Sequence, residues 1–97
     1  MTFNWDDEKN QLLKRTRGIG FEDIIIAIHE GELMDIVDHP NKHRYPNQRI
    51  YLVACHNYIY AVPFVHSEKT DEIFLKTIFP SRRYTKFYLQ ARGDLDG

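Results

Sequence analysis

The chain has 97 residues, of which 42% are hydrophobic and 28% charged, and its formal net charge is -1. This length suits a single domain over residues 1–97, and no apolar run approaches the roughly 20 residues that span a bilayer. Acidic residues at 6–8 stand where a signal peptide would be apolar, and the lone Cys55 fits a reducing compartment, so we expect a cytoplasmic protein without membrane contact.

Two helices are predicted near the N-terminus. Asp6 is a good N-cap for a helix over residues 7–16, and Gly18 is a natural left-handed stop. Apolar residues spaced i, i+3, i+4 and i+7 predict a second helix over residues 21–30. The alternation around residues 3–5 predicts a short opening strand before them.

Strands and one further helix are predicted in the rest of the chain. Pro63 cannot donate to a neighbouring strand, so we expect a bulge or an edge position there. The sequence therefore predicts an α+β fold of order βααββββα: a four-stranded antiparallel sheet, with a short N-terminal strand, two N-terminal helices and one C-terminal helix. The predicted ranges are strands 33–39, 50–55, 58–65 and 72–79, a helix over 81–91 and a frayed tail over 93–97.

Lys76 interrupts the apolar residues of the last predicted strand. A lysine in a strand costs free energy on burial unless its face is open to water or to an anion. If the two N-terminal helices cover the other face, Lys76 projects from an open one. Strict alternation predicts one face with Ile73, Leu75 and Phe79 and the other with Phe74, Lys76 and Ile78.

The charges are divided unevenly along the chain. Residues 1–38 carry four basic and nine acidic side chains, whereas residues 39–97 carry nine basic and five acidic ones. Between residues 73 and 93 there are five Lys or Arg and no Asp or Glu. Arg82 and Arg83 stand at the predicted start of the last helix, where the helix dipole does not favour cations. We interpret this segment as the functional end of the molecule and RNA, a polyanion, as its ligand.

Three short motifs resemble the BrnT family of toxins. They are Phe3-x-Trp5-Asp6-x-x-Lys9, Gly18-Ile19-x-Phe21-Glu22 and Arg82-Arg83-x-Thr85, and the resemblance covers about residues 2–90. The chain departs from the family at two places. Arg17 replaces a histidine that many members carry, and the family's strand arginine falls on Thr77, with Lys76 one place earlier and so on the opposite face. Either a register shift restores Lys76 to that role or the contribution of the strand is lost.

The resemblance implies a RelE-like fold and a biological role. The family forms the toxin half of type II toxin–antitoxin pairs and acts as a metal-independent endoribonuclease. Its partner resembles a ribbon-helix-helix DNA-binding protein, so contact with DNA would be indirect, through the antitoxin. No cofactor and no metal are expected.

Metal-independent RNA cleavage needs a group that stabilises a phosphorane-like dianion and groups that move protons. We assign Arg82 and Arg83 to a phosphate clamp, because guanidinium groups bond two phosphate oxygens at once. Lys76 is a second cation, and His66 is the best acid or base. The predicted RNA-binding residues are Arg17, Arg49, Tyr84 and Lys86.

Two other functions stay open from the sequence. A non-catalytic, degenerate toxin would bind an antitoxin-like partner without cleaving RNA. A plain RNA-binding domain would stack bases on aromatic side chains of an open sheet face, and Phe74, Tyr58 and Tyr60 are the candidates. Each cation also has a plain structural alternative, a solvated helix start for Arg82 and Arg83 and a sheet-edge side chain for Lys76.

Overall fold

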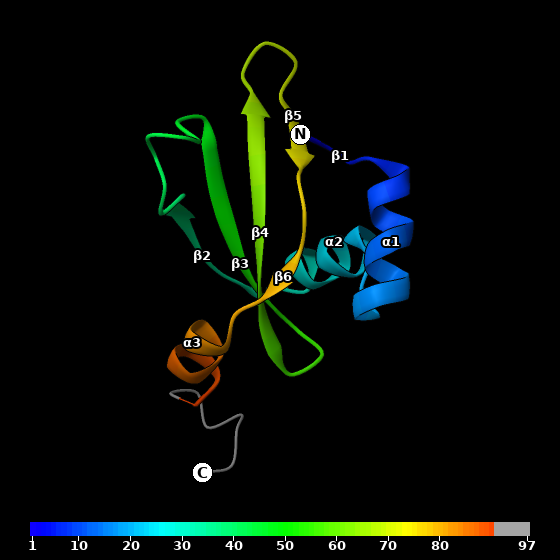
Figure 1. Ribbon diagram of the computed structural model, residues 1–97, viewed down its shortest axis with the longest axis vertical. Coiled ribbons are helices and arrows are strands. Elements are labelled where there is room, and N and C mark those ends of the chain that lie inside the picture. Colours follow the sequence, from blue (N-terminus) through cyan, green and yellow to red (C-terminus); the bar gives the residue numbers. More distant parts are fainter. Residues whose placement is uncertain (91–97) are drawn as a thin grey trace.

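A mixed sheet with helices packed against it makes up the protein, as seen in a computed structural model that describes residues 1–90. The strands lie in the order β1-β5-β4-β3-β2, with β6 added to β4 (Figure 1). Within these residues the elements are β1 (Thr2–Asn4), α1 (Asp7–Arg17), α2 (Phe21–His29), β2 (Leu33–Asp38), β3 (Gln48–Cys55), β4 (Tyr58–Ser67), β5 (Glu72–Leu75), β6 (Phe79–Pro80), α3 (Arg82–Thr85) and a π-helical turn η1 (Lys86–Gln90).

The ends of α1 follow the predicted signals. The Asp6 carboxylate accepts a hydrogen bond from the Lys9 backbone N–H at 3.0 Å, and Gly18 ends the helix with φ of 69°. Asn10 then joins α1 to α2: its side-chain oxygen accepts from the Phe21 N–H, and its amide donates to Glu22, both at 2.8 Å. Because Asn10 is only 2% exposed, both groups of its side chain find partners where water is excluded.

Each face of the sheet carries its own apolar cluster. On one face, Leu13 of α1 and Phe21 and Ile24 of α2 pack with strand residues that include Ile73 and Leu75. On the other face, strand residues pack against Leu89 of η1. The buried strand residues of this second cluster are Ile50, Leu52, Ala54, Ile59 and Ala61.

The sheet is mixed rather than wholly antiparallel. β2, β3, β4 and β5 form the predicted antiparallel succession. β1 pairs with β5 in parallel, with Phe3 opposite Ile73. The described residues thus form a sheet of six strands, not the four-stranded antiparallel sheet with a short added strand that the sequence predicted.

The predicted strand over 72–79 is interrupted, and Pro63 is the reason. The backbone N–H of Lys76 donates to the carbonyl of Pro63 at 2.8 Å, but Pro63 has no N–H to return a bond. Between the pair Phe64↔Leu75 and the pair Ala61↔Phe79, β4 advances by three residues and its partner by four. One extra residue therefore bulges between β5 and β6. Pro63 itself stays in register opposite Ile50 in β4, so the bulge lies in the facing segment and not in the strand where the sequence predicted it.

The bulge exchanges the faces of the next two side chains. Ile78 is fully buried in the cluster under α1 and α2, whereas Phe79 is 38% exposed. Strict alternation had placed Phe79 inside and Ile78 outside, and that prediction is wrong because alternation assumes an unbroken strand. Lys76 does lie on the exposed side with Phe74, as predicted.

The last helix is shorter and less regular than predicted. α3 and η1 together cover Arg82–Gln90, whereas the prediction ran over 81–91. The predicted tail over 93–97 lies outside the described residues. Among residues 1–90, no helix has the length and apolar character needed to cross a membrane.

Candidate functional site

Backbone and hydroxyl groups fasten α3 to β4. The Ser81 N–H donates to the carbonyl of Ile59 at 2.9 Å. The Thr85 hydroxyl accepts from the Ile59 N–H at 2.8 Å and donates to the Ser81 carbonyl at 2.7 Å. The Ser81 hydroxyl accepts from the Tyr84 N–H at 3.2 Å. Because Thr85 and Leu89 face the sheet and are buried, the other side of this segment faces solvent.

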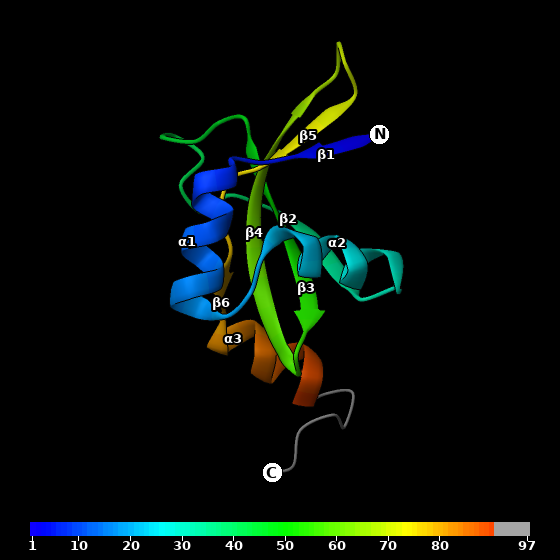
Figure 2. The ribbon, with the colours of Figure 1, turned by 90° about the vertical axis from the view of Figure 1, so that its right-hand side faces the viewer.

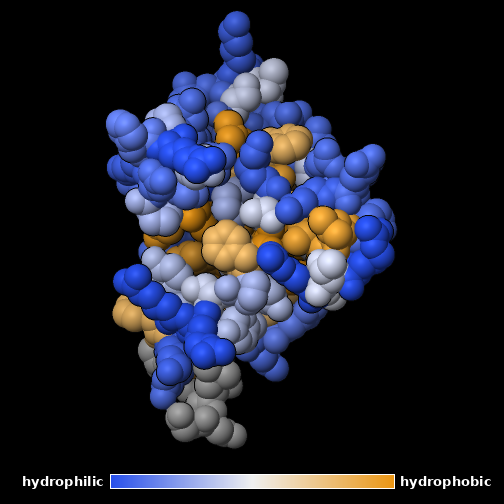
Figure 3. Space-filling model, viewed as in Figure 1, coloured by the Kyte–Doolittle hydropathy of each residue, from blue (hydrophilic) through white to orange (hydrophobic). Residues whose placement is uncertain are grey.

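The solvent side of α3 and η1 carries three cations. Arg82, Arg83 and Lys86 are all exposed. Within residues 1–90, none of them lies within 4.0 Å of a carboxylate, whereas Lys14 and Lys42 do, in pairs of 3.0 and 2.9 Å. Figure 3 shows strongly hydrophilic side chains gathered over α3. Three neighbouring positive charges therefore remain uncompensated by the described part of the chain.

Aromatic rings are interleaved with these cations. The Arg83 guanidinium lies 5.6 Å from the centroid of the Tyr84 ring, and the Phe87 and Tyr88 centroids are 4.8 Å apart. Phe87 is 66% exposed. An open groove of about 560 Å³ runs beside them, lined by Asp35, Val37, Arg83, Tyr84, Lys86, Phe87 and Tyr88.

The Tyr88 hydroxyl closes one side of this groove by donating to the Asp35 carboxylate at 3.2 Å. Burial and the nearby negative charge of Asp35 raise the pKa of Tyr88. Tyr88 therefore stays a neutral phenol at physiological pH, which suits a structural wall rather than a proton-transfer group.

Lys76 lies in a different groove. This groove separates the first turns of α1 from the end of β5, and its lining shares no residue with the groove beside α3. The Lys76 ammonium is 5.3 Å from the centroid of the Phe74 ring, and Asp6, Asp7 and Glu8 line the same groove. Lys9 and Arg15 line it as well, so the predicted second cation faces acidic and basic side chains of α1 and not the arginines of α3.

His66 lies at the far end of β4 from α3. Its Nε2 is 2.9 Å from an Asp71 carboxylate oxygen, and this hydrogen bond is the main cause that lowers the pKa of Asp71. Tyr60 pairs with Pro80 beside α3, and six residues of extended strand, roughly 20 Å, separate Tyr60 from His66. Figure 2 shows the β4–β5 turn and α3 at opposite ends of the sheet. The structure does not bring His66 together with Arg82 and Arg83.

Arg17 and Arg49, predicted to bind RNA, both have partners in the chain. The Arg17 guanidinium donates to the carbonyl of Ile78, which ties the end of α1 to the segment leading into α3. The Arg49 Nε is 3.8 Å from the Asp38 carboxylate. Asp38 also bonds Lys42, and the Lys42 ammonium, followed by Arg49, holds the pKa of Asp38 below its usual value. Arg49 is therefore partly neutralised.

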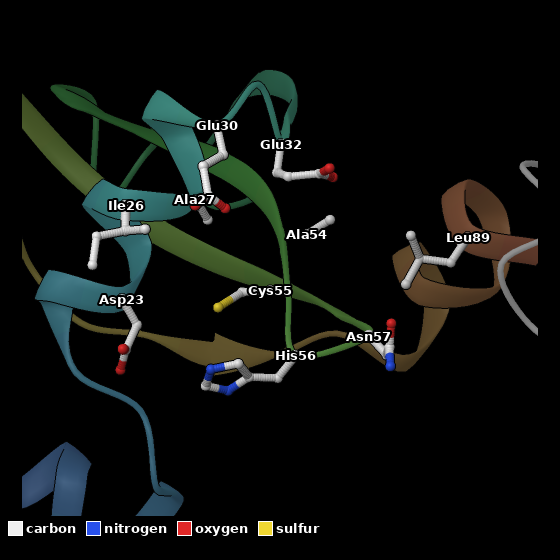
Figure 4. A pocket seen from close by; sticks show the side chains of 10 residues that line it. All are labelled: Asp23, Ile26, Ala27, Glu30, Glu32, Ala54, Cys55, His56, Asn57 and Leu89. Carbon is white, nitrogen blue, oxygen red and sulfur yellow. The ribbon is translucent and has the colours of Figure 1, made fainter.

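A pocket of about 320 Å³ lies between α2, the β3–β4 turn and η1. Figure 4 shows the Cys55 thiol and the His56 ring pointing toward α2. A neighbouring Cys and His could suggest a nucleophile, but burial and then Asp23 and Glu30 raise the pKa of Cys55. A reactive cysteine needs the opposite shift, so this pocket does not support nucleophilic chemistry. Its lining residues are Asp23, Ile26, Ala27, Glu30, Glu32, Ala54, Cys55, His56, Asn57 and Leu89.

The aromatic residues beside the cations differ from those predicted for base stacking. Tyr60 packs against the cluster under α1 and α2, whereas Phe74 lines the groove between α1 and the end of β5 that also contains Lys76. Phe87 was missed, and Tyr88 was considered only as one of six tyrosines able to stack bases, most of which were expected in the core. The signal that could have found them is the alternation of basic and aromatic residues over 82–88, with rings three and four residues apart.

Of the eight predicted site residues, the structure brings Arg82, Arg83, Tyr84 and Lys86 together, and Phe87 joins them. We call these five residues the C-terminal patch. No protein-family model, no curated protein and no solved structure matches the chain.

Proposed function

We propose that this chain is the toxin of a type II toxin–antitoxin pair, with a RelE-like fold, and that it binds and cleaves RNA through the C-terminal patch. The observation that carries the proposal is the set of three exposed cations without carboxylate partners in the described chain, placed among aromatic rings on a firmly anchored helix. The proposed location is the cytoplasm.

The physical argument is one of charge compensation. Three like charges on two turns repel one another, and a polyanion removes that repulsion while releasing its counterions. The forked guanidinium groups of Arg82 and Arg83 fit a phosphodiester, and they would stabilise the negative charge that grows when the 2′-hydroxyl attacks phosphorus. Lys86 would hold a neighbouring phosphate. His66 and Lys76 lie away from the patch, so we propose no catalytic role for them. The 2′-hydroxyl would give its proton to water, and the leaving 5′-oxygen would take a proton from water.

The proposed protein partner is an antitoxin of the ribbon-helix-helix class that neutralises the toxin by covering the patch. Contact with DNA would then belong to the antitoxin alone. Binding of the antitoxin and binding of RNA would compete, because both use Arg82 and Arg83.

A cleavage assay tests the proposal. Purified protein is incubated with mixed RNA in the presence of a chelator, next to the variants Arg82→Gln and Arg83→Gln. The matched control is Arg44→Gln, an exposed arginine that also lies over a ring, that of Tyr45. We expect metal-independent cleavage by the wild type and the control and strong loss in both patch variants. Equal cleavage by all four proteins would refute the phosphate clamp.

A second candidate is the non-catalytic interaction module. It is favoured by the bond between His66 and Asp71 and by the distance of both from α3, since no histidine then serves a phosphate held at the patch. Under this candidate the protein binds an antitoxin-like partner and neither cleaves nor retains RNA in the same assay, whereas retention of RNA without cleavage would indicate a plain RNA-binding domain.

A further inference from the structure

Phe87 is exposed in a way that core packing does not explain. Two thirds of the side chain, 66%, is open to solvent, although burying a phenylalanine stabilises a fold by roughly 1.5–3 kcal/mol. Its ring meets the Tyr88 ring nearly perpendicularly, at 81°. No second ring is stacked face to face on it among residues 1–90.

The neighbouring rings of Tyr84 and Tyr88 are held in place by other parts of the fold. The Tyr84 and Tyr88 centroids lie 6.0 Å apart. Tyr88 is held by its bond to Asp35, and Tyr84 packs with it against the apolar cluster of the second sheet face. Phe87 is therefore an exposed ring on a rigid base, and immobilising it in a complex costs little conformational entropy.

Two cations line the same groove as this ring. Lys86 precedes Phe87 directly, and Arg83 lies one helical turn before it, on the same groove. Among residues 1–90 these cations have no carboxylate partner. An exposed ring beside such cations is the combination that single-stranded nucleic acid uses: phosphates contact the cations and a base stacks on the ring. In an A-form duplex the bases are already stacked and paired, so only the phosphates would be available.

We infer that Phe87 is a base-stacking residue and that the patch selects RNA with unpaired bases over duplex RNA. This inference rests on the proposed function only in taking RNA as the ligand. A partner protein could also cover such a ring, but the flanking positive charges favour a nucleic-acid strand, which carries a phosphate at each nucleotide.

The test compares a 12-nucleotide single-stranded RNA with its duplex by fluorescence anisotropy at one salt concentration. We expect the wild type to prefer the single strand. Phe87→Ala should weaken single-strand binding about 5- to 150-fold, the range of one lost base–aromatic stack, and leave duplex binding unchanged. Phe87→Leu keeps an apolar side chain without a π-face, so it should behave like Phe87→Ala. Phe87→Trp keeps an aromatic ring and should retain the wild-type affinity for the single strand.

The matched control is Ile26→Ala, because Ile26 is also a largely exposed apolar side chain, 56% exposed, but on α2. It should bind both RNAs as the wild type does. If Phe87→Ala keeps wild-type affinity while Arg83→Gln loses it, stacking is wrong and the proposed function stands. If the wild type binds neither RNA, the proposed function itself fails. Full retention by Phe87→Leu would show that the ring serves an apolar contact and would also overturn stacking.

Discussion

Lys76 donates its backbone N–H to the carbonyl of Pro63 at 2.8 Å, and Pro63 offers no hydrogen bond in return. This pair, in which only one of two backbone hydrogen bonds can form, lies at the end of β5. The extra residue that follows it turns Ile78 into the core and Phe79 toward solvent. A proline in one strand thereby sets which side chains the next segment buries on its way to the C-terminal patch.

Because the bulge buries Ile78 and exposes Phe79, truncating these two side chains should lower the free energy of unfolding by different amounts. Ile78→Ala should lower the free energy of unfolding by about 2–5 kcal/mol, because it empties a fully buried site. Phe79→Ala removes a larger side chain but one that is 38% exposed, so its cost should be about 1 kcal/mol. Urea denaturation of the two variants measures both values. A larger loss for Phe79→Ala would mean that the strand runs on without a bulge.

The Thr85 hydroxyl should contribute more to the free energy of unfolding than an exposed threonine hydroxyl does. Thr85→Val keeps the shape but leaves the buried N–H of Ile59 without its acceptor, which costs about 1–3 kcal/mol. Thr85→Ser retains the acceptor and should cost less. The control is Thr16→Val: the Thr16 hydroxyl donates to the Leu12 carbonyl on an exposed helix side, so its loss should change stability by about 0.5 kcal/mol at most. Thermal denaturation of the three variants checks the order, and equal effects of Thr85→Val and Thr16→Val would contradict it.

RNA affinity should depend on salt through the cations of the patch. For a single strand, the logarithm of the binding constant falls with the logarithm of salt concentration by about 0.7 per neutralised phosphate. Arg83→Gln should reduce that slope by about 0.7, and the same change at Lys69, on the β4–β5 turn, should leave it unaltered. Anisotropy titrations between low and moderate salt measure the slope. An identical slope for both variants would place the phosphates elsewhere on the surface.

Stability should fall in acid partly through Glu22. The side-chain hydrogen bond from Asn10 is the largest cause that lowers the pKa of Glu22 below 4.5, and Lys14 adds to it. Because the folded-state pKa lies below the unfolded one, the stabilisation is present above about pH 4.5 and is lost as pH falls through the folded value. Glu22→Gln should therefore destabilise the protein most at neutral pH, and the difference should shrink in acid. Urea titrations at pH 7 and pH 3 test this, and a difference that does not depend on pH would rule it out.

Local signals predicted the helices well because their causes lie within a few residues. Asp6 and Gly18 act on their own helix ends. Pro63 predicted an interruption of the sheet, but the bulge lies in the segment facing it rather than in β4. The parallel pairing of β1 with β5 could not be predicted, since nothing near Phe3 indicates that Ile73 is its neighbour. The faces of Ile78 and Phe79 were assigned wrongly, because the proline that interrupts the pairing belongs to another strand.

The same distinction holds for the candidate site. Arg82, Arg83, Tyr84 and Lys86 lie together because they are neighbours on one short helical segment. His66 is distant from them in the sequence, so only the tertiary fold could bring it close. It lies instead at the end of β4 opposite to α3.

The parallel pairing of Thr2–Asn4 with residues 72–74 has a consequence for how a nascent chain folds. Translation delivers β1 first, and the elements from α1 to β4 follow before its partner strand β5. α1 can form as soon as it leaves the ribosome, because the residues that begin and end it, Asp6 and Gly18, directly flank it. β1, however, can join the sheet only after β5 has been made, so the parallel pair at this edge of the sheet forms later than α1.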